Sequence, residues 1–173
     1  KILKLMKRRY LRNVYETRFE YIRKRIPNAC IGSDVIVGFP GEDELEFTET
    51  YNFLKSIDIS YLHVFSYSER SNTSSILLNK KVSKIIKNER SKILRELSNS
   101  KKLEFYKKNV NNYHNVLFET ENKNGYIYGY TENYVRVKSL WSNSKQNKIL
   151  NCYLDGIDRD FNCIAEQAVE LKV

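Results

Sequence analysis

Few side chains in this sequence have the type and spacing that catalysis or metal binding requires. Cys30, Cys152 and Cys163 are far apart, and His63 and His114 have no carboxylate or thiolate neighbour at metal-ligand spacing. Phosphate-loop and serine-nucleophile motifs are absent from the sequence. The residues therefore predict no catalytic group and no metal ligand, and they favour binding sites instead.

The first candidate binding site is the segment 33–42, which reads SDVIVGFPGE. Its β-branched run stops at Gly38, and the following Pro-Gly pair favours a sharp turn. Three acidic residues then fall in what would be the first turn of a helix, where the helix dipole stabilises them. Asp34 and Glu42 could form a carboxylate pair, although a helix start already explains Glu42. In a βαβ unit this turn would lie at the carboxyl end of a strand, where such sheets bind ligands.

The second candidate is a nucleic-acid surface on an expected strand over residues 134–138. Two valines would point to one face of this strand, and an aromatic residue with two cations would point to the other. A ring can stack on a base while cations hold its phosphates, although an ordinary half-exposed strand is the alternative. Two residues that precede the strand, Tyr130 and Asn133, could add a second stacking surface and a base-edge donor. The candidate RNA-binding set is therefore Tyr130, Asn133, Tyr134, Arg136 and Lys138.

The overall charge agrees with a polyanionic partner. The sequence has 30 Lys and Arg against 21 Asp and Glu, a formal net charge of +9 and a pI near 9.4. Many basic proteins bind nothing specific, so the positions of the charges matter more than their sum. No apolar run approaches the ~18 residues of a membrane span, and three cysteines without close pairing fit a reducing compartment. We therefore expect a cytoplasmic protein without a membrane partner.

Helices and strands must position the first site. Helical periodicity and β-branched runs predict helices over 13–25, 43–56 and 83–107, and strands over 34–37 and 61–65. The apolar stripes expected to pack on the core are Tyr15, Phe19, Ile22 and Ile26; Phe47, Tyr51 and Leu54; and Ile86, Ile93 and Leu97. The rest of the third helix is basic, either as a solvated face or as a path for RNA backbone. The cations of this face are Lys84, Lys87, Arg90, Lys92, Arg95, Lys101 and Lys102.

After a polar segment at 109–115 the pattern changes to a period of two. Short strands separated by turns such as Asn124-Gly125 are expected over 116–119, 126–128, 134–138, 149–154 and 164–166. Five strands in so short a stretch indicate a small closed barrel of the OB-like type. The predicted fold class is α/β plus all-β, with domains at 1–110 and 111–173.

Four blocks of this sequence resemble the radical S-adenosylmethionine methylthiotransferases that modify tRNA. They are LMKRRY at 5–10, SDVIVGFPGE at 33–42, HVFSYSER at 63–70 and GYTENYVRV at 129–137. The order and spacing agree with the end of the family's partial (β/α) barrel followed by its RNA-binding TRAM domain. The YTENY form is most similar to the branch that acts on N6-threonylcarbamoyladenosine beside the anticodon.

The resemblance implies a function and site residues. The family adds a methylthio group to C2 of the adenosine, using S-adenosylmethionine and [4Fe-4S] clusters. It implies that Ile36, Val37 and Gly38 lie along the adenosine of S-adenosylmethionine and that Val64 and Phe65 close the apolar side. Arg8 would face the cofactor's carboxylate. Asp34 stands where the family's adenosine motif often has a glycine, and Glu42 lies one place late.

The family holds its catalytic cluster on a CxxxCxxC loop, which is absent from this sequence. The sequence therefore resembles the C-terminal portion of a longer enzyme whose N-terminal part would be its partner. We expect this portion alone to be catalytically inactive, and to be poorly stable or self-associating. The alternatives are a non-catalytic RNA-binding module, or a sister methylthiotransferase acting on isopentenyladenosine or on a ribosomal protein.

Overall fold

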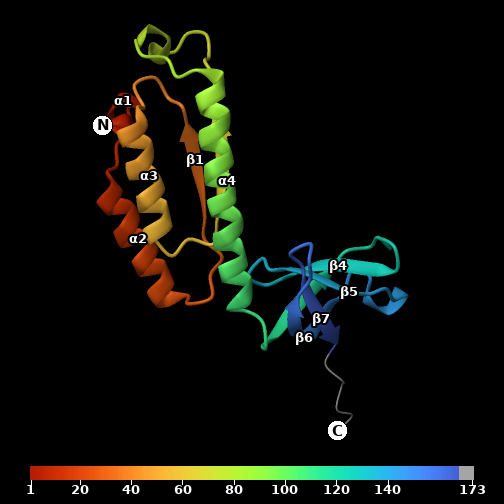
Figure 1. Cartoon of the computed structure of the whole chain (residues 1–173). Coiled ribbons are helices and arrows are strands. Elements are labelled where there is room, and N and C mark those ends of the chain that lie inside the picture. The colour runs from red at the N-terminus through yellow and green to blue at the C-terminus, as the bar shows by residue number, and fades with distance from the viewer. Residues whose placement is uncertain (168–173) are drawn as a thin grey trace. The chain divides into compact units, whose positions relative to one another are not determined.

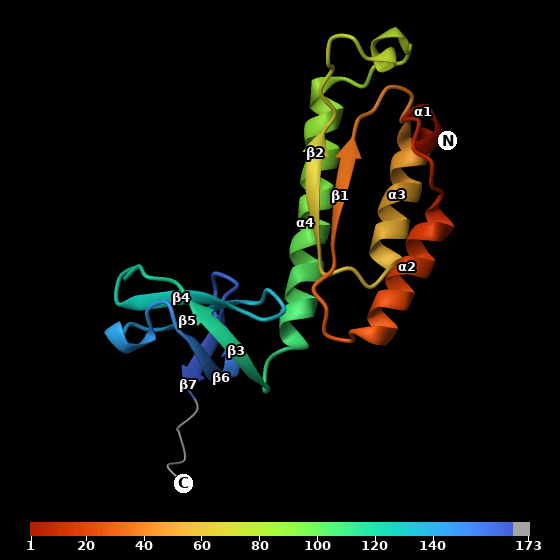
Figure 2. The same cartoon turned by 180° about the vertical axis from the view of Figure 1, so that it is seen from behind.

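The computed structural model describes residues 1–167 and divides the chain after Lys102 into two compact units. The first is an α/β unit and the second contains a β-barrel, as Figures 1 and 2 show from opposite sides. Helix α4 is continuous across the division, so its last turn belongs to the second unit. Each unit is described separately below.

The α/β unit contains one βαβ motif, as the sequence predicted. Strands β1 and β2 are parallel neighbours and are joined through α3. The helices and strands lie within one or two residues of their predicted ranges. In chain order the elements are α1 (Ile2–Leu5), α2 (Arg12–Arg25), β1 (Gly32–Val37), α3 (Glu44–Ser56), β2 (Tyr61–Ser66), a 3-10 turn (Ser74–Leu77) and α4 (Lys84–Lys107).

Helix α3 begins with a capping box. The Asp43 side chain accepts hydrogen bonds from the backbone N–H groups of Leu45 and Glu46, and the Glu46 carboxylate accepts one from the Asp43 N–H. These contacts satisfy donors that have no partner within the helix. Phe47 and Leu54 of this helix are buried, so the predicted start and apolar stripe are confirmed.

The sheet has only one covered face, so each of its strands is buried on one side only. Val35 and Val37 alternate inward and pack with Phe47 and Leu54 of α3 and with apolar residues of α4. The opposite face of β1 and β2 lies in front in Figure 2 and has no helix over it. In an edge-to-edge pair of strands, period-two alternation buries every second residue only.

Two of the predicted apolar stripes need correction. In α2, Tyr15 and Phe19 are half-buried, but Ile22 is exposed, as is Ile26 just after the helix. In α4, Ile86 is also exposed. Leu94, which the predicted stripe omitted, is fully buried. The core therefore meets only the first part of the predicted stripe of α2, and in α4 it meets a face that includes Leu94 and excludes Ile86.

The basic face of α4 is also not uniformly solvated. Arg90 and Lys101 are buried, and the Lys101 ammonium donates to the backbone carbonyls of Lys55 and Ile57 at the end of α3. A cation at a helix C-terminus satisfies carbonyls that have no partner in the helix. Two members of the predicted cationic face thus hold the unit together.

The second unit contains the predicted closed barrel. Its strands follow the order β3-β4-β5-β7-β6, with every neighbouring pair antiparallel except β5 and β7. Inward residues such as Val116, Phe118, Ile127 and Val137 are fully buried. The strands are β3 (Tyr113–Phe118), β4 (Tyr126–Thr131), β5 (Arg136–Leu140), β6 (Ile149–Ile157) and β7 (Cys163–Gln167), with a 3-10 turn at Asn143–Lys145.

We expect Gly129→Ala to destabilise the barrel strongly. A Cβ at Gly129 would lie 2.4 Å from the backbone oxygen of Leu117, whereas a Cβ at Gly156 would have no atom within 4 Å. Backbone cannot move aside as a flexible side chain does, so the free energy of unfolding should fall by about 2 kcal/mol or more. Urea unfolding measures it, with Gly156→Ala as the matched control. Equal stability of the two variants would contradict this reading of the barrel.

Candidate functional site

The turn after β1 is held by one buried carboxylate. Gly38 has a φ of +76°, and its N–H donates to both oxygens of the Glu42 carboxylate at 3.1 Å. Glycine adopts this left-handed conformation without steric cost. The carboxylate therefore closes the Gly38–Glu42 turn on itself, at the carboxyl end of β1.

Arg90 of α4 completes this arrangement. Its Nη1 donates to Glu42 Oε1 at 2.9 Å and to the Glu42 carbonyl at 3.0 Å, and its Nη2 lies 3.3 Å from Glu44. The guanidinium stands over the Phe47 ring at 5.0 Å, and Arg90 is only 5% exposed. Burial raises the pKa of Glu42, while the bonds from Gly38 and Arg90 oppose that rise. A residue 48 positions downstream thus fixes the turn.

The structure separates the predicted cofactor residues onto two faces of the sheet. Ile36 and Phe65 are cross-strand partners on the open face, 37% and 52% exposed. Val37 and Val64 belong to the opposite face, where Val37 is buried and Val64 packs on the core. Neighbouring strand residues point to opposite faces, so Val64 and Phe65 do not present their side chains to one ligand.

The open face offers an apolar surface beside polar groups. Tyr61 and His63 of β2 share it, with their rings 4.9 Å apart, and Asp34 is exposed on it. The exposed pair Ile36 and Phe65 fits the flat apolar support that a purine needs. The Gly38 N–H is already bound by Glu42, so it is not a free donor for a ligand.

Arg8 lies outside the sheet. It follows α1, is exposed, and its backbone N–H donates to the Leu3 carbonyl. Among the described residues, no ion pair engages its side chain. Its charge is thus available to an anion.

The residues of this chain do not fit an iron-sulfur cluster. Among residues 1–167, no group of three His, Cys, Asp or Glu side chains is placed to hold a metal. Cys152 and Cys163 are buried in the barrel, and burial raises the pKa of all three cysteines, that of Cys163 to about 12. Cluster ligation requires thiolates, and the raised pKa of these groups disfavours that form.

The barrel carries an aromatic ladder on its outer surface. Tyr126, Tyr128 and Tyr130 alternate outward along β4, and Tyr130 and Tyr128 face Arg136 and Lys138 across the strand pair. The Arg136 guanidinium lies 4.5 Å from the Tyr130 ring centroid and 5.2 Å from that of Tyr128. Cations and rings therefore interleave on one face, which is a surface suited to stacked bases.

Both cations of this ladder already have acidic partners. Arg136 binds the Glu119 carboxylate with both Nη atoms, and Lys138 lies 3.1 Å from Asp158. The hydrogen bond from Arg136 lowers the pKa of Glu119, so this carboxylate stays ionised at neutral pH. The sequence hypothesis assigned Arg136 and Lys138 to phosphates, and the structure adds two carboxylates that compete for them.

The two turn residues of the predicted set differ from each other. Tyr134 is 72% exposed at a φ of +65°, with its ring 5.8 Å from that of Tyr130. It lies in the turn rather than in the predicted strand, because β5 begins at Arg136. Asn133 instead stabilises the turn, since its amide donates to Asn109 and its oxygen accepts from Thr131. Tyr134 remains open to a ligand, and Asn133 has structural partners.

Comparison with known proteins places this geometry in context. A threonylcarbamoyladenosine tRNA methylthiotransferase from Aquifex aeolicus is 46% identical over 138 residues, which is 80% of this chain and 32% of that protein. Its counterpart from Bacillus subtilis is 40% identical over 141 residues, or 79% of this chain and 31% of that protein. The chain is homologous to the C-terminal part of tRNA methylthiotransferases. A tRNA-2-methylthio-N(6)-dimethylallyladenosine synthase from Syntrophus aciditrophicus is 36% identical over 151 residues, or 87% of this chain and 30% of that protein.

This chain spans about a third of the length of these methylthiotransferases. No family model matches its sequence. In the part of the chain that the structure describes, no helix is long and apolar enough to span a membrane.

Sequence reasoning missed the partners that the predicted cations have in the structure. Arg90 was assigned to a basic face that was either solvated or a path for RNA backbone, and Glu119 and Asp158 were assigned no role. The periodicity of α4 does place Arg90 one turn before Leu94, on the side that faces the core. That spacing was the available signal for its burial.

We expect Arg90→Met to unfold more easily than Arg95→Met, an exposed control on the same helix. Losing Arg90 leaves the buried Glu42 carboxylate without its partner, which costs about 3–5 kcal/mol, against about 0.5 kcal/mol for a surface change. Urea unfolding at pH 7 measures both.

The raised pKa of Glu42 makes the folded state bind a proton more readily than the unfolded state. Loss of the guanidinium should raise this pKa further, so the deficit should shrink as the pH falls through the Glu42 pKa of the folded variant. A deficit that is constant from pH 7 to pH 5 would contradict the role of the carboxylate.

Proposed function

We propose that this chain is the C-terminal part of an enzyme that adds a methylthio group to N6-threonylcarbamoyladenosine in tRNA. The observation that carries the proposal is its 46% identity to the threonylcarbamoyladenosine tRNA methylthiotransferase of Aquifex aeolicus. The barrel with its outer tyrosine ladder supports a role in holding RNA. We also propose that the enzyme is cytoplasmic, and that an N-terminal part of the same enzyme holds the catalytic cluster.

The second candidate is methylthiolation of a dimethylallyl-type adenosine. It is supported by the dimethylallyladenosine synthases among the relatives, which are 31–39% identical to this chain. We favour the threonylcarbamoyl substrate because the threonylcarbamoyladenosine enzymes of Aquifex aeolicus and Bacillus subtilis are more similar to this chain, at 46% and 40% identity. Both candidates share one reaction type and differ in the group on the adenosine N6.

In the α/β unit we assign the binding of S-adenosylmethionine to the open sheet face. When bound, the cofactor supplies the radical chemistry and the methyl group of the family. Ile36 and Phe65 would support its adenine at the carboxyl end of β1 and β2. Arg8, which is exposed and without an acidic partner among the described residues, suits the cofactor's carboxylate. Glu42 and Arg90 would act indirectly, by fixing the turn beside the adenine.

In the barrel we assign RNA contact to Tyr130 and Tyr134. Both rings are exposed and adjacent, so a base can stack on either one. Arg136 would hold a phosphate only when it leaves Glu119, as would Lys138 when it leaves Asp158. Because the phosphate must displace a carboxylate, the affinity of this site for a phosphate alone is lowered. RNA is favoured over other phosphates because its bases can also stack on the tyrosine rings.

Loss of the full gene should remove the methylthio group from threonylcarbamoyladenosine and leave the unmodified nucleoside to accumulate. Nucleoside mass spectrometry of total tRNA measures both, with re-expression of the gene as the control. Normal methylthiolation of the dimethylallyl-type adenosine in the same sample checks specificity. Accumulation of the dimethylallyl-type nucleoside instead would favour the second candidate, and unchanged tRNA would contradict both.

We expect Glu119→Gln to strengthen tRNA binding by this chain. The substitution frees the Arg136 guanidinium, so one more phosphate can be neutralised and the salt dependence should steepen by about one unit of log–log slope. Fluorescence anisotropy at several salt concentrations measures it. Glu121→Gln is the matched control, because it removes the same charge from the exposed pair with Lys123. An equal gain in both variants would mean that net charge, rather than release of Arg136, controls the affinity.

A further inference from the structure

The two units differ sharply in charge. Residues 1–102 carry 21 Lys and Arg against 12 Asp and Glu, whereas residues 103–173 carry nine of each. The whole excess of +9 therefore belongs to the α/β unit, and the barrel unit is neutral. Attraction of a polyanion scales with the phosphates that cations neutralise. The barrel's rings can stack on bases, and we expect the α/β unit to supply most of the phosphate contacts.

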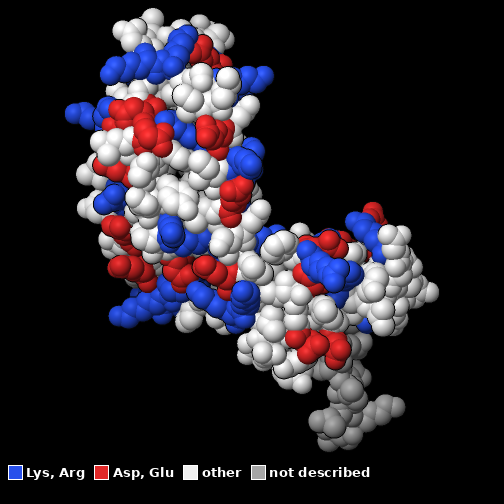
Figure 3. All heavy atoms as spheres, viewed as in Figure 1, with Lys and Arg blue, Asp and Glu red and all other residues white. Residues whose placement is uncertain are grey.

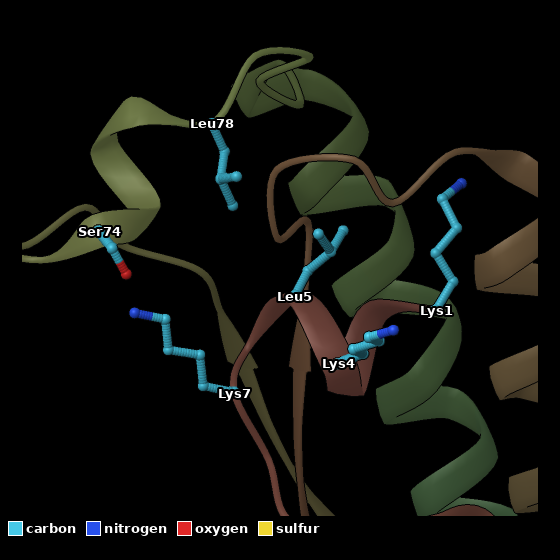
Figure 4. Close-up of a pocket in the computed structure, with 6 residues that line it drawn as sticks. All are labelled: Lys1, Lys4, Leu5, Lys7, Ser74 and Leu78. Carbon is cyan, nitrogen blue, oxygen red and sulfur yellow. The ribbon is translucent and has the colours of Figure 1, made fainter.

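One hollow in the α/β unit combines cations with an apolar lining. It has a volume of about 610 Å³ and lies between α1 and the segment that follows β2. Figure 4 shows Leu5 and Leu78 pointing toward each other, and the Lys7 ammonium reaching toward the Ser74 hydroxyl. We call this the lysine hollow, and its lining residues are Lys1, Lys4, Leu5, Lys7, Ser74 and Leu78.

Two of the three lysines of the hollow are available to an anion. Lys1 is bound to Glu46 and lies 3.7 Å from Asp43. Lys4 and Lys7 have no acidic partner in the part of the chain that the structure describes. An exposed ammonium without a carboxylate neighbour binds a phosphate without first losing a bond, unlike Arg136 of the barrel.

The lysine hollow also lies close to the candidate cofactor turn. A Cβ at Gly41 would be 3.3 Å from Leu5, and the Gly41 N–H donates to the Lys80 carbonyl. Both contacts place α1 and the segment after β2 against the end of β1, where ligands of such sheets bind. On the face that Figure 3 shows, this end of the α/β unit carries basic side chains next to acidic ones.

We propose that the lysine hollow binds one nucleotide of the RNA strand. The Lys7 ammonium and the Ser74 hydroxyl hold its phosphate, Lys4 holds a neighbouring phosphate of the strand, and Leu5 and Leu78 pack against its base or ribose. An apolar lining suits a nucleotide better than an acidic peptide, and the volume falls in the ordinary range of small-ligand sites. The inference rests on the proposed tRNA substrate, and it assigns the phosphate contacts to a different unit from the tyrosine ladder.

The test compares tRNA binding by the chain and by a Lys4→Gln/Lys7→Gln variant over a series of salt concentrations. Each lost phosphate contact should lower the log–log slope by about 0.7–0.9, so the double variant should lose about 1.5 units. The matched control is Lys24→Gln/Lys92→Gln, which removes two exposed charges elsewhere in the same unit. A Lys4→Arg/Lys7→Arg variant should restore the slope, because it restores the charge.

A second measurement uses acylation of lysines, read by mass spectrometry. Bound tRNA should protect Lys4 and Lys7 at least severalfold and leave Lys24 and Lys92 reactive, whereas free adenosine monophosphate at the same nucleotide concentration should protect none of them. Protection by the mononucleotide alone would assign the hollow to a free nucleotide and overturn the proposal. Equal slopes in the two glutamine variants would overturn it as well. Absence of tRNA binding by the unaltered chain would instead refute the proposed function itself.

Discussion

The buried pair of Glu42 and Arg90 is the contact on which the α/β unit depends. The carboxylate closes the turn after β1 through the Gly38 N–H, and the guanidinium ties that turn to α4. The same guanidinium reaches Glu44 in the first turn of α3 and covers Phe47 in the core. Three elements are therefore held by one ion pair at the end of the sheet where a ligand would bind.

The cost of burying these charges explains why the Glu42 carboxylate and both Arg90 Nη atoms have partners, although the buried Arg90 Nε has none among residues 1–167. Glu42 and Arg90 are both under 10% exposed, and an isolated buried charge is strongly unfavourable. The carboxylate has two backbone or side-chain donors, and the Arg90 Nη atoms have three acceptors. Such a pair contributes less to the free energy of folding than to a unique turn geometry, because any other turn would leave one charge without partners.

Much of the fold could be predicted from local patterns. The βαβ unit follows from the glycine turn and from the acids that begin α3, and the barrel follows from strands with a period of two. These signals are local, since dihedral preferences and capping involve residues a few positions apart. The alternation of Val135 and Val137 with outward cations was likewise confirmed.

What the sequence did not reveal depends on contacts between distant residues. Arg90 meets Glu42 across 48 positions, and Arg136 meets Glu119 across 17. A pattern shows that a cation is present and which face it occupies, but not whether an acid already binds it. For the same reason, only the structure distinguishes the paired cations of the barrel from Lys4 and Lys7, which have no acidic partner among the described residues.

The parallel contact between β5 and β7 has a consequence for synthesis of the chain. Strand β7 is the last of the five, and it joins β5 to β6 to close the barrel. A nascent chain on the ribosome therefore cannot complete the barrel until β7 has emerged, whereas the βαβ unit is available much earlier. During translation the cationic unit would meet nucleic acid before the aromatic surface exists.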